Sequence, residues 1–219
     1  TKLTLGILEG RLKENGVDSG NLHAATPGEI IMLGCFSVGF IRVNHSIPDS
    51  VGLSIKTPVG MIVHTGDFKF DYTPVDGKMT DFRRLADLGN KGVLVMLADS
   101  TNAEKEGHTP SEKTVGEAFN REFAEAQGRI IVATFSSNVH RIQQVIDIEE
   151  IVNYPANKIV IVTTGSQGEP MSALTRMAMS DHRQVDIIQG DTVIISATPI
   201  PGNEKVVAKT IDNLLRLGA

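Results

Sequence analysis

The chain has 219 residues, of which 41% are apolar, enough for one large domain or two small ones with a hydrophobic core. Its formal net charge of −5 argues against a broad basic face that wraps nucleic acid, so a nucleic-acid partner would have to be bound locally. The single cysteine excludes an internal disulfide framework and a zinc site built from several thiolates.

The first half of the chain is predicted to be rich in β-strands. A helix is expected over residues 3–12, because apolar residues recur there at helical spacing. Two strand pairs are expected to follow, one around Gly34 and one around residues 58–60. The strands of these pairs are 29–33 with 36–43, and 53–56 with 61–63.

The second half alternates strands with helices, which indicates a parallel sheet with helices on both faces. Thr109, Pro110 and Glu112 form a helix-start pattern, so a helix is expected to open at Thr109. The composition changes near residues 104–109, which makes this segment the best candidate for a domain boundary. The expected strands are 92–98, 129–135, 158–163 and 192–197, and further helices are expected over 139–152, from about 171 and over 204–217.

No membrane or export signal is visible in the sequence. The longest apolar runs, such as residues 92–98, are too short to span a bilayer, and no charged-then-apolar leader opens the chain. Cys35 lies in an apolar stretch and is expected to be a buried, inert thiol. This cysteine usage fits a reducing compartment, so we expect a cytoplasmic protein without a membrane partner.

Each of the four strands of the second half is followed by a loop rich in Ser, Thr, Asn and Gly. Open α/β sheets bind ligands outside the carboxyl ends of their strands, and helix N-termini there favour anions. The loops therefore point to a phosphate-bearing ligand, although each one alone is also an ordinary set of cap and turn residues. His140 follows one such loop, and either faces an anion or lies on a helix surface.

Two strand ends carry candidate metal ligands. His45 lies two residues after the strand expected over 36–43, and Asp67 follows a glycine just after the strand expected over 61–63. Both could converge on one edge, where an imidazole and a carboxylate are ordinary ligands of Zn²⁺ or Mn²⁺. Two ligands do not complete a zinc site, which takes about four, so capping and turn roles remain the alternative. Asp71 and Asp76 are expected to be turn acids.

Four ordered motifs resemble the ribonuclease J family, in the β-CASP branch of the metallo-β-lactamase superfamily. They read VNHSIPDSVGLSIKTPVGMIVHTGDFKFD, LADSTNAEKEGHTPSEKTV, ATFSSNVHRIQQV and TTGSQGEPMSALTRMA, and together the resemblance covers nearly the whole chain. It implies an α/β fold in which residues 1–105 form part of a metallo-β-lactamase αββα sandwich. Residues 106–219 would form a parallel-sheet β-CASP domain that is incomplete at its C-terminal end.

The resemblance also implies a chemistry and the residues that perform it. The reaction is hydrolysis of single-stranded RNA, both endonucleolytic and 5′-to-3′ exonucleolytic, in RNA processing (including rRNA) and decay. A complete site would hold two zinc ions, with Mn²⁺ or Mg²⁺ as alternatives, and the full-length protein would be a dimer or tetramer. The implied metal ligands are His45 and Asp67, the implied catalytic residues are Asp67, Asp99 and His140, and the implied substrate-binding residues are Ser136, Ser137, Asn138 and His140.

The sequence departs from the family pattern in three places. The main metal motif, His-x-His-x-Asp-His, should lie upstream of Thr1, and further motif histidines should follow Ala219. Relatives carry a longer stretch near residues 147–148, which is either deleted or left out of this sequence. We therefore expect a parent protein that is a zinc-dependent ribonuclease, and a 219-residue chain that alone binds metal poorly and cleaves nothing.

Three other functions stay open. A β-CASP protein without catalysis could serve as an RNA-binding or oligomerising scaffold. A metallo-hydrolase of the same superfamily could act on a small ester. A nucleotide-binding Rossmann module is disfavoured, because no G-x-G-x-x-G follows any expected strand.

Overall fold

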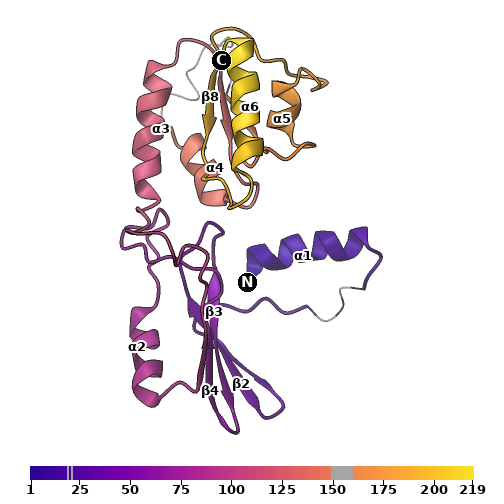
Figure 1. Cartoon of the computed structure of the whole chain (residues 1–219). Helices are drawn as coiled ribbons and strands as arrows, with labels where there is room; N and C mark the ends of the chain where they lie inside the picture. Colours follow the sequence, from indigo (N-terminus) through magenta and orange to yellow (C-terminus); the bar gives the residue numbers. More distant parts are fainter. Residues whose placement is uncertain (19, 21, 149–159) are drawn as a thin grey trace. The chain divides into compact units, whose positions relative to one another are not determined.

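The structure is a computed structural model that describes residues 1–18, 20, 22–148 and 160–219. The chain divides into two compact units, Thr1–Lys113 and Thr114–Ala219, and each unit has its own β-sheet (Figure 1). The mixed α/β class expected from the sequence is confirmed. Among the helices of the described residues, none has the length and apolarity that a bilayer crossing requires.

The first unit is built on a five-stranded sheet of order β1-β2-β3-β4-β5. Neighbouring strands are antiparallel, except that β5 runs parallel to β4. The predicted helix and both predicted strand pairs are confirmed. The elements are α1 (Lys2–Glu14), β1 (Ile30–Leu33), β2 (Phe36–Arg42), β3 (Val51–Thr57), β4 (Gly60–His64), α2 (Phe82–Lys91) and β5 (Val95–Leu97).

Helix α2 covers one face of this sheet. Its N-terminus is capped by Asp81, whose carboxylate accepts a hydrogen bond of 3.0 Å from the backbone N–H of Arg84. Leu88 of α2 packs with Ile41 of β2 and Val63 of β4, and these three residues form the buried core of the unit. The small core holds β2 and β4 together, and both strands end close to the candidate site residues.

Two expectations for the first unit are wrong. Residues 92–98 were expected to form a buried strand of the second-half sheet, but β5 pairs with β4 and all three of its residues are exposed. Cys35 was expected to be buried, but it is exposed at the β1–β2 turn, because this hairpin tip carries its apolar residues beyond the core. In both places the apolar residues are exposed, and no other segment of the described part of the chain packs over them.

The second unit has a three-stranded parallel sheet of order β7-β6-β8. The expected alternation of strands and helices is confirmed, with three strands rather than four. The helix expected over 139–152 ends at Ile146, with Asp147 as its C-cap. Residues 149–152 of that expected helix and residues 158 and 159 of an expected strand lie outside the described residues. The elements are α3 (Lys113–Glu125), β6 (Ile130–Ala133), α4 (Val139–Ile146), β7 (Val160–Thr163), α5 (Ala173–Ala178), β8 (Thr192–Ile195) and α6 (Glu204–Leu217).

The central strand β6 is buried on both faces. Ile130 and Val132 pack with the α3 and α4 side chains, whereas Ile131 and Ala133 pack with those of α5 and α6. Each of these four residues is fully inaccessible to solvent. Two opposite apolar faces explain why the strand reads as a continuous apolar run rather than as an alternating pattern.

The start of α3 is set by a buried acid that is distant in sequence. The backbone N–H of Glu112 donates to the Asp71 carboxylate at 2.9 Å, and the Lys69 ammonium lies 3.3 Å from the Glu112 carboxylate. Glu112 is therefore not available to form a capping box with Thr109, and the helix begins at Lys113. The prediction that it opens at Thr109 is wrong for this reason. Asp71 is a buried anchor as well as a turn acid.

The environment of Asp71 favours its ionised form. Burial of the carboxyl by itself raises its pKa. Several contacts lower the pKa and together outweigh burial, so that it lies below its ordinary value of 3.8. The largest of them are hydrogen bonds from the Glu112 N–H and the Ser111 hydroxyl. The backbone N–H of Thr73 and the Lys69 ammonium, 3.6 Å from the carboxylate, act in the same direction.

We predict that Leu174→Ala destabilises the second unit by about 2–5 kcal/mol, because it removes a fully buried side chain and leaves a cavity. Hydrogen exchange of the β6 backbone amides measures this loss. The matched variant Leu215→Ala removes the same atoms from a side chain of α6 that is 63% exposed, and should change the free energy by less than about 0.5 kcal/mol. Equal effects of the two variants would contradict the proposed core.

We predict that Asp71→Asn lowers the free energy of unfolding at pH 7 by about 2 kcal/mol, since it removes charge-assisted hydrogen bonds. The unfolded chain binds the Asp71 proton more tightly than the folded chain does. The stabilisation is therefore fully present above pH 3.8 and is lost as the pH falls through the lower folded pKa. Urea unfolding as a function of pH checks this, with the exposed turn acid Asp76→Asn as control.

Candidate functional site

His45 is held in place by its buried neighbour Asn44. The Asn44 amide donates to the carbonyl of Lys78 at 2.8 Å and accepts from the backbone N–H and the hydroxyl of Thr80, both at 3.0 Å. The carbonyl of Asn44 accepts a hydrogen bond from the N–H of Lys69 at 2.8 Å, which forms an isolated antiparallel bridge. The end of β2 is therefore tied to the segment that follows Asp67.

Asp67 follows β4 through a turn that requires glycine. Gly66 has a φ of 62°, and a Cβ there would lie 2.9 Å from the carbonyl oxygen of Val51. Thr65, which is buried, donates its hydroxyl to the carbonyl of Gly66 at 2.7 Å. The turn brings the Asp67 carboxylate out to the surface, where its side chain is 79% exposed.

The structure brings His45 and Asp67 together. The Nε2 atom of His45 lies 3.9 Å from an Oδ2 oxygen of Asp67. Two ligand atoms of one zinc ion lie at most about 4.2 Å apart, the sum of two bonds, and about 3.4 Å apart in a tetrahedral site. The observed separation falls between these limits, so a shift of about 0.5 Å would let both groups bind one ion.

Asp99 lies at the same rim, just after β5. Its backbone N–H donates to the Thr65 hydroxyl at 3.0 Å, which joins it to the turn before Asp67. The pKa of Asp99 is lowered, first by hydrogen bonds from the Thr101 hydroxyl at 2.6 Å and its N–H at 2.9 Å. Partial burial opposes this shift, while the Phe68 N–H and the charge of His45 support it. The Asp99 carboxylate is therefore ionised at neutral pH.

The donors at this rim fit part of a metal site. Across residues 1–18, 20, 22–148 and 160–219, no three His, Cys, Asp or Glu side chains group closely enough to hold an ion. His45 and Asp67 supply two ligands, one neutral and one anionic, of the roughly four that zinc takes. The neighbouring His64 is exposed, and its Nδ1 accepts a hydrogen bond from the Gly66 N–H at 3.0 Å.

The other expected site residues belong to the second unit. Ser136 and Ser137 are exposed at the end of β6, and His140 is half-buried in the first turn of α4. Asn138 is buried, and its side-chain oxygen caps α4 by accepting a hydrogen bond from the N–H of Arg141 at 3.2 Å. The two serine hydroxyls and the imidazole are thus the accessible polar groups of this loop.

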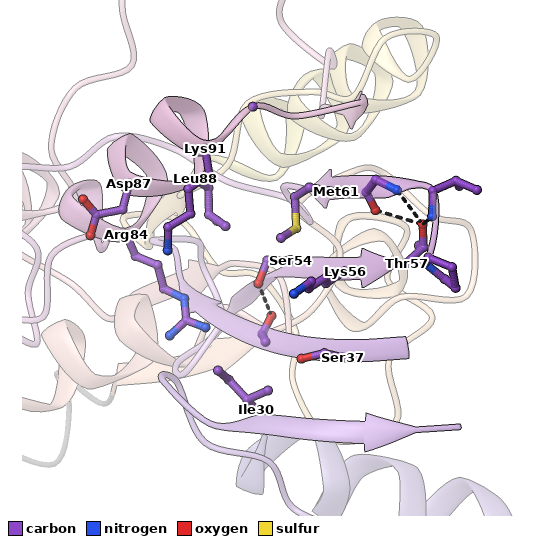
Figure 2. Close-up of a pocket in the computed structure, with 15 residues that line it drawn as sticks. Ile30, Ser37, Ser54, Lys56, Thr57, Met61, Arg84, Asp87, Leu88 and Lys91 are labelled. Atoms are coloured by element: carbon purple, nitrogen blue, oxygen red, sulfur yellow. Dashed lines mark hydrogen bonds between the residues drawn. The ribbon is translucent and has the colours of Figure 1, made fainter. Parts of the chain in front are cut away.

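A separate pocket of about 850 Å³ lies between α2 and the sheet of the first unit. Figure 2 shows Lys56, Arg84 and Lys91 among the residues that line it. Gly39 leaves room for the Arg84 guanidinium, which would lie 2.5 Å from a Cβ at that position. The lining comes from β1, β2, β3, β4 and α2 and includes neither His45 nor Asp67, so the pocket is not part of the rim described above.

Sequence reasoning missed the buried polar residues that support the site. Asn44, Thr65 and Thr80 are each less than 9% exposed and form the hydrogen bonds that join the strand ends. Thr101, which holds Asp99, was also missed. A polar residue inside an otherwise apolar strand end, as in Val43-Asn44-His45, is the one sequence signal that could have found such a support.

The chain is similar to one family throughout much of its length. A family model described as "Ribonuclease J, beta-CASP domain" matches residues 144–214. Ribonuclease J of Thermus thermophilus is 41% identical over 258 residues, a match that covers 100% of this chain and 45% of that protein. Ribonuclease J2 of Bacillus subtilis is 41% identical, with 100% and 46% covered, and ribonuclease J of Helicobacter pylori is 42% identical, with 99% and 37% covered.

The chain therefore spans less than half the length of these curated relatives. The match to the Thermus thermophilus protein extends over 258 residues although this chain has 219, so that relative carries residues without a counterpart in this sequence. The location expected for them, near residues 147–148, stays a prediction. Among solved structures, a protein of unknown function from Enterococcus faecalis V583 has a similar fold, with a TM-score of 0.51, 14% identity, and 90% of this chain and 60% of that chain covered.

Proposed function

Because the chain belongs to the ribonuclease J family, we propose that it is part of a metal-dependent nuclease that hydrolyses the phosphodiester bonds of single-stranded RNA. The reaction would occur within the RNA and from its 5′ end, in RNA processing, rRNA processing and decay. The observation that carries the proposal is the approach of His45 and Asp67, whose ligand atoms lie 3.9 Å apart at one exposed rim. Residues 1–105 are assigned to the metallo-β-lactamase domain and residues 106–219 to the β-CASP domain.

In this proposal His45 and Asp67 hold divalent metal. Two zinc ions would occupy the complete site, with Mn²⁺ or Mg²⁺ as alternatives, and the Asp67 carboxylate would be one of their ligands. Metal ions in such a site lower the pKa of a bound water and neutralise the attacked phosphate. The exposed carboxylate of Asp67 and the imidazole of His45 suit this role. One anionic ligand and one neutral ligand do not cancel the charge of a divalent ion, so the site stays positive.

The remaining site residues bind and orient the RNA. The ionised carboxylate of Asp99, fixed by Thr101, can accept a proton or hydrogen bond from a group held beside Asp67. The hydroxyls of Ser136 and Ser137 can donate to a phosphate oxygen, and Asn138 shapes their loop by capping α4. His140 follows in the first turn of α4, where a protonated imidazole can donate to the same phosphate.

The complete protein would work in the cytoplasm as a dimer or tetramer, with RNA as its substrate. The 219-residue chain by itself would bind metal weakly and cleave nothing, because its described residues bring together two metal ligands where zinc takes about four. A second candidate function follows from the same observation. A chain whose metal site is never completed would serve as an RNA-binding or oligomerising scaffold.

In the complete protein, Asp67→Ala is expected to reduce RNA hydrolysis by more than about 100-fold, since even outer partners of metal ligands contribute about 10–100-fold. Bound metal should fall as well. Cleavage of a labelled single-stranded RNA and metal analysis of the purified protein measure the two effects. The exposed acid Asp76→Ala is the control. Full activity and full metal content in Asp67→Ala would refute the metal site and leave the scaffold.

In the same protein, His140→Ala is expected to lower the turnover rate by about 10²–10⁴-fold, the usual contribution of a positioned acid or base. The metal content should stay unchanged, because His140 is proposed to contact RNA rather than metal. His182→Ala, in a loop of the same unit, is the matched control. If His140→Ala strips the metal instead, its proposed role is wrong.

A further inference from the structure

A second cavity of the first unit lies directly beside Asp99. Its volume is about 310 Å³, near the lower end of the roughly 300–1,000 Å³ typical of small-molecule pockets. This volume suits one nucleoside rather than an extended ligand. The cavity is lined by Phe68, Lys69, Phe70, residues 99–103, His108 and Thr109.

One wall of this cavity is aromatic. Phe68, Phe70 and Tyr72 alternate with Lys69 and Asp71, so the rings share one side of an extended segment. The Phe68 and Phe70 ring centroids lie 5.2 Å apart. Phe70 lies 5.1 Å from the ring of Phe82 and is 51% exposed. One part of the Phe70 ring is therefore supported by other rings while another part faces solvent.

Another part of the cavity wall is polar and uncharged. It includes Ser100, Asn102 and His108, whose side chains form no hydrogen bond within the described part of the chain. An amide and an imidazole can each donate and accept hydrogen bonds, as the edge of a nucleobase also does. The wall is thus able to bind the edge of a planar ring whose face lies on Phe70.

The charge of the cavity favours a base over a phosphate. Its one lysine, Lys69, is 3.6 Å from the Asp71 carboxylate and 3.3 Å from the Glu112 carboxylate, so its charge is already balanced. Asp99 adds a negative charge at the rim. A phosphate would meet no unpaired lysine or arginine among the residues that line this cavity, whereas stacking of a neutral base needs none.

We propose that this cavity is a nucleobase-binding subsite, in which an unpaired base stacks on Phe70 while its edge contacts Asn102 and His108. The inference rests on the proposed function, and it adds a recognition element to the RNA hydrolysis assigned above. Because Asp99 lines both the cavity and the rim with Asp67, a base in the cavity would hold its own phosphodiester next to that rim. Phe70 is a residue that binds the nucleotide beside the scissile bond.

The test measures binding by the 219-residue chain in a buffer that contains a metal chelator, so that hydrolysis cannot contribute. The probes are a fluorescently labelled oligouridylate and a matched oligomer of abasic ribose phosphates. Phe70→Leu, which keeps an apolar side chain but loses the aromatic face, should weaken oligouridylate binding about tenfold. Binding of the abasic oligomer should stay unchanged.

Two further variants separate stacking from loss of structure. Phe70→Tyr keeps the aromatic face and should bind oligouridylate as the unmodified chain does. Phe36→Leu alters another exposed phenylalanine, at the β1–β2 hairpin, and should also leave binding unchanged. The proposal is overturned if Phe70→Leu affects both probes equally, if it affects neither, or if the unmodified chain does not prefer oligouridylate over the abasic oligomer.

These outcomes are independent of the proposed catalysis. A preference for base-bearing RNA that depends on Phe70, in a complete protein that hydrolyses no RNA, would support the subsite and refute the nuclease. Hydrolysis that depends on Asp67, with a chain that binds both probes equally, would support the nuclease and refute the subsite.

Discussion

The buried amide of Asn44 is the interaction on which the geometry of the candidate site depends. It joins the end of β2 to residues 78–80, and the Asn44 backbone joins the same point to Lys69. A buried amide without partners would cost about 1–3 kcal/mol, so these segments are held in one arrangement. His45 follows Asn44 and Asp67 lies two residues before Lys69, which places both at one rim. The supporting groups are buried, whereas His45 is half-buried and Asp67 is exposed, so rigidity and access to a metal come from different residues.

In residues 68–72, which follow Asp67, successive side chains point to alternate sides of the backbone, and the two sides serve different purposes. Lys69 and Asp71 face inward and bind Glu112, which ties this segment to the residues that precede α3. Phe68, Phe70 and Tyr72 take the alternate positions and present aromatic surface. This arrangement bears on the acidic charge of the chain, because stacking on aromatic rings binds nucleotides without a basic face. The net charge of the chain is −5, so RNA binding would rely on metal at the rim and on the aromatic rings beside it rather than on a basic surface.

Periodicity alone identified most of the elements, including α1, both hairpins of the first unit, and α6. It failed where a distant partner decides the outcome. Residues 92–98 are apolar on both faces, as β6 is, but β5 is exposed at the edge of the first sheet while β6 is enclosed by four helices. The local pattern is the same in both strands, and what covers them is not encoded locally. The start of α3 failed in the same way, because Asp71 binds the Glu112 N–H from about forty positions away.

The sequence by itself determined which residues carry chemistry, that His45 and Asp67 end strands, and which family the motifs resemble. These properties follow from side-chain type and from short-range backbone geometry, which a single segment contains. Only the tertiary structure decided that Nε2 of His45 lies 3.9 Å from the Asp67 carboxylate, that Thr65 ties Asp99 to the same rim, and that Asn138 is a buried helix cap. Each of these depends on buried hydrogen bonds and packing between residues far apart in the chain, and no local pattern specifies which distant groups will meet.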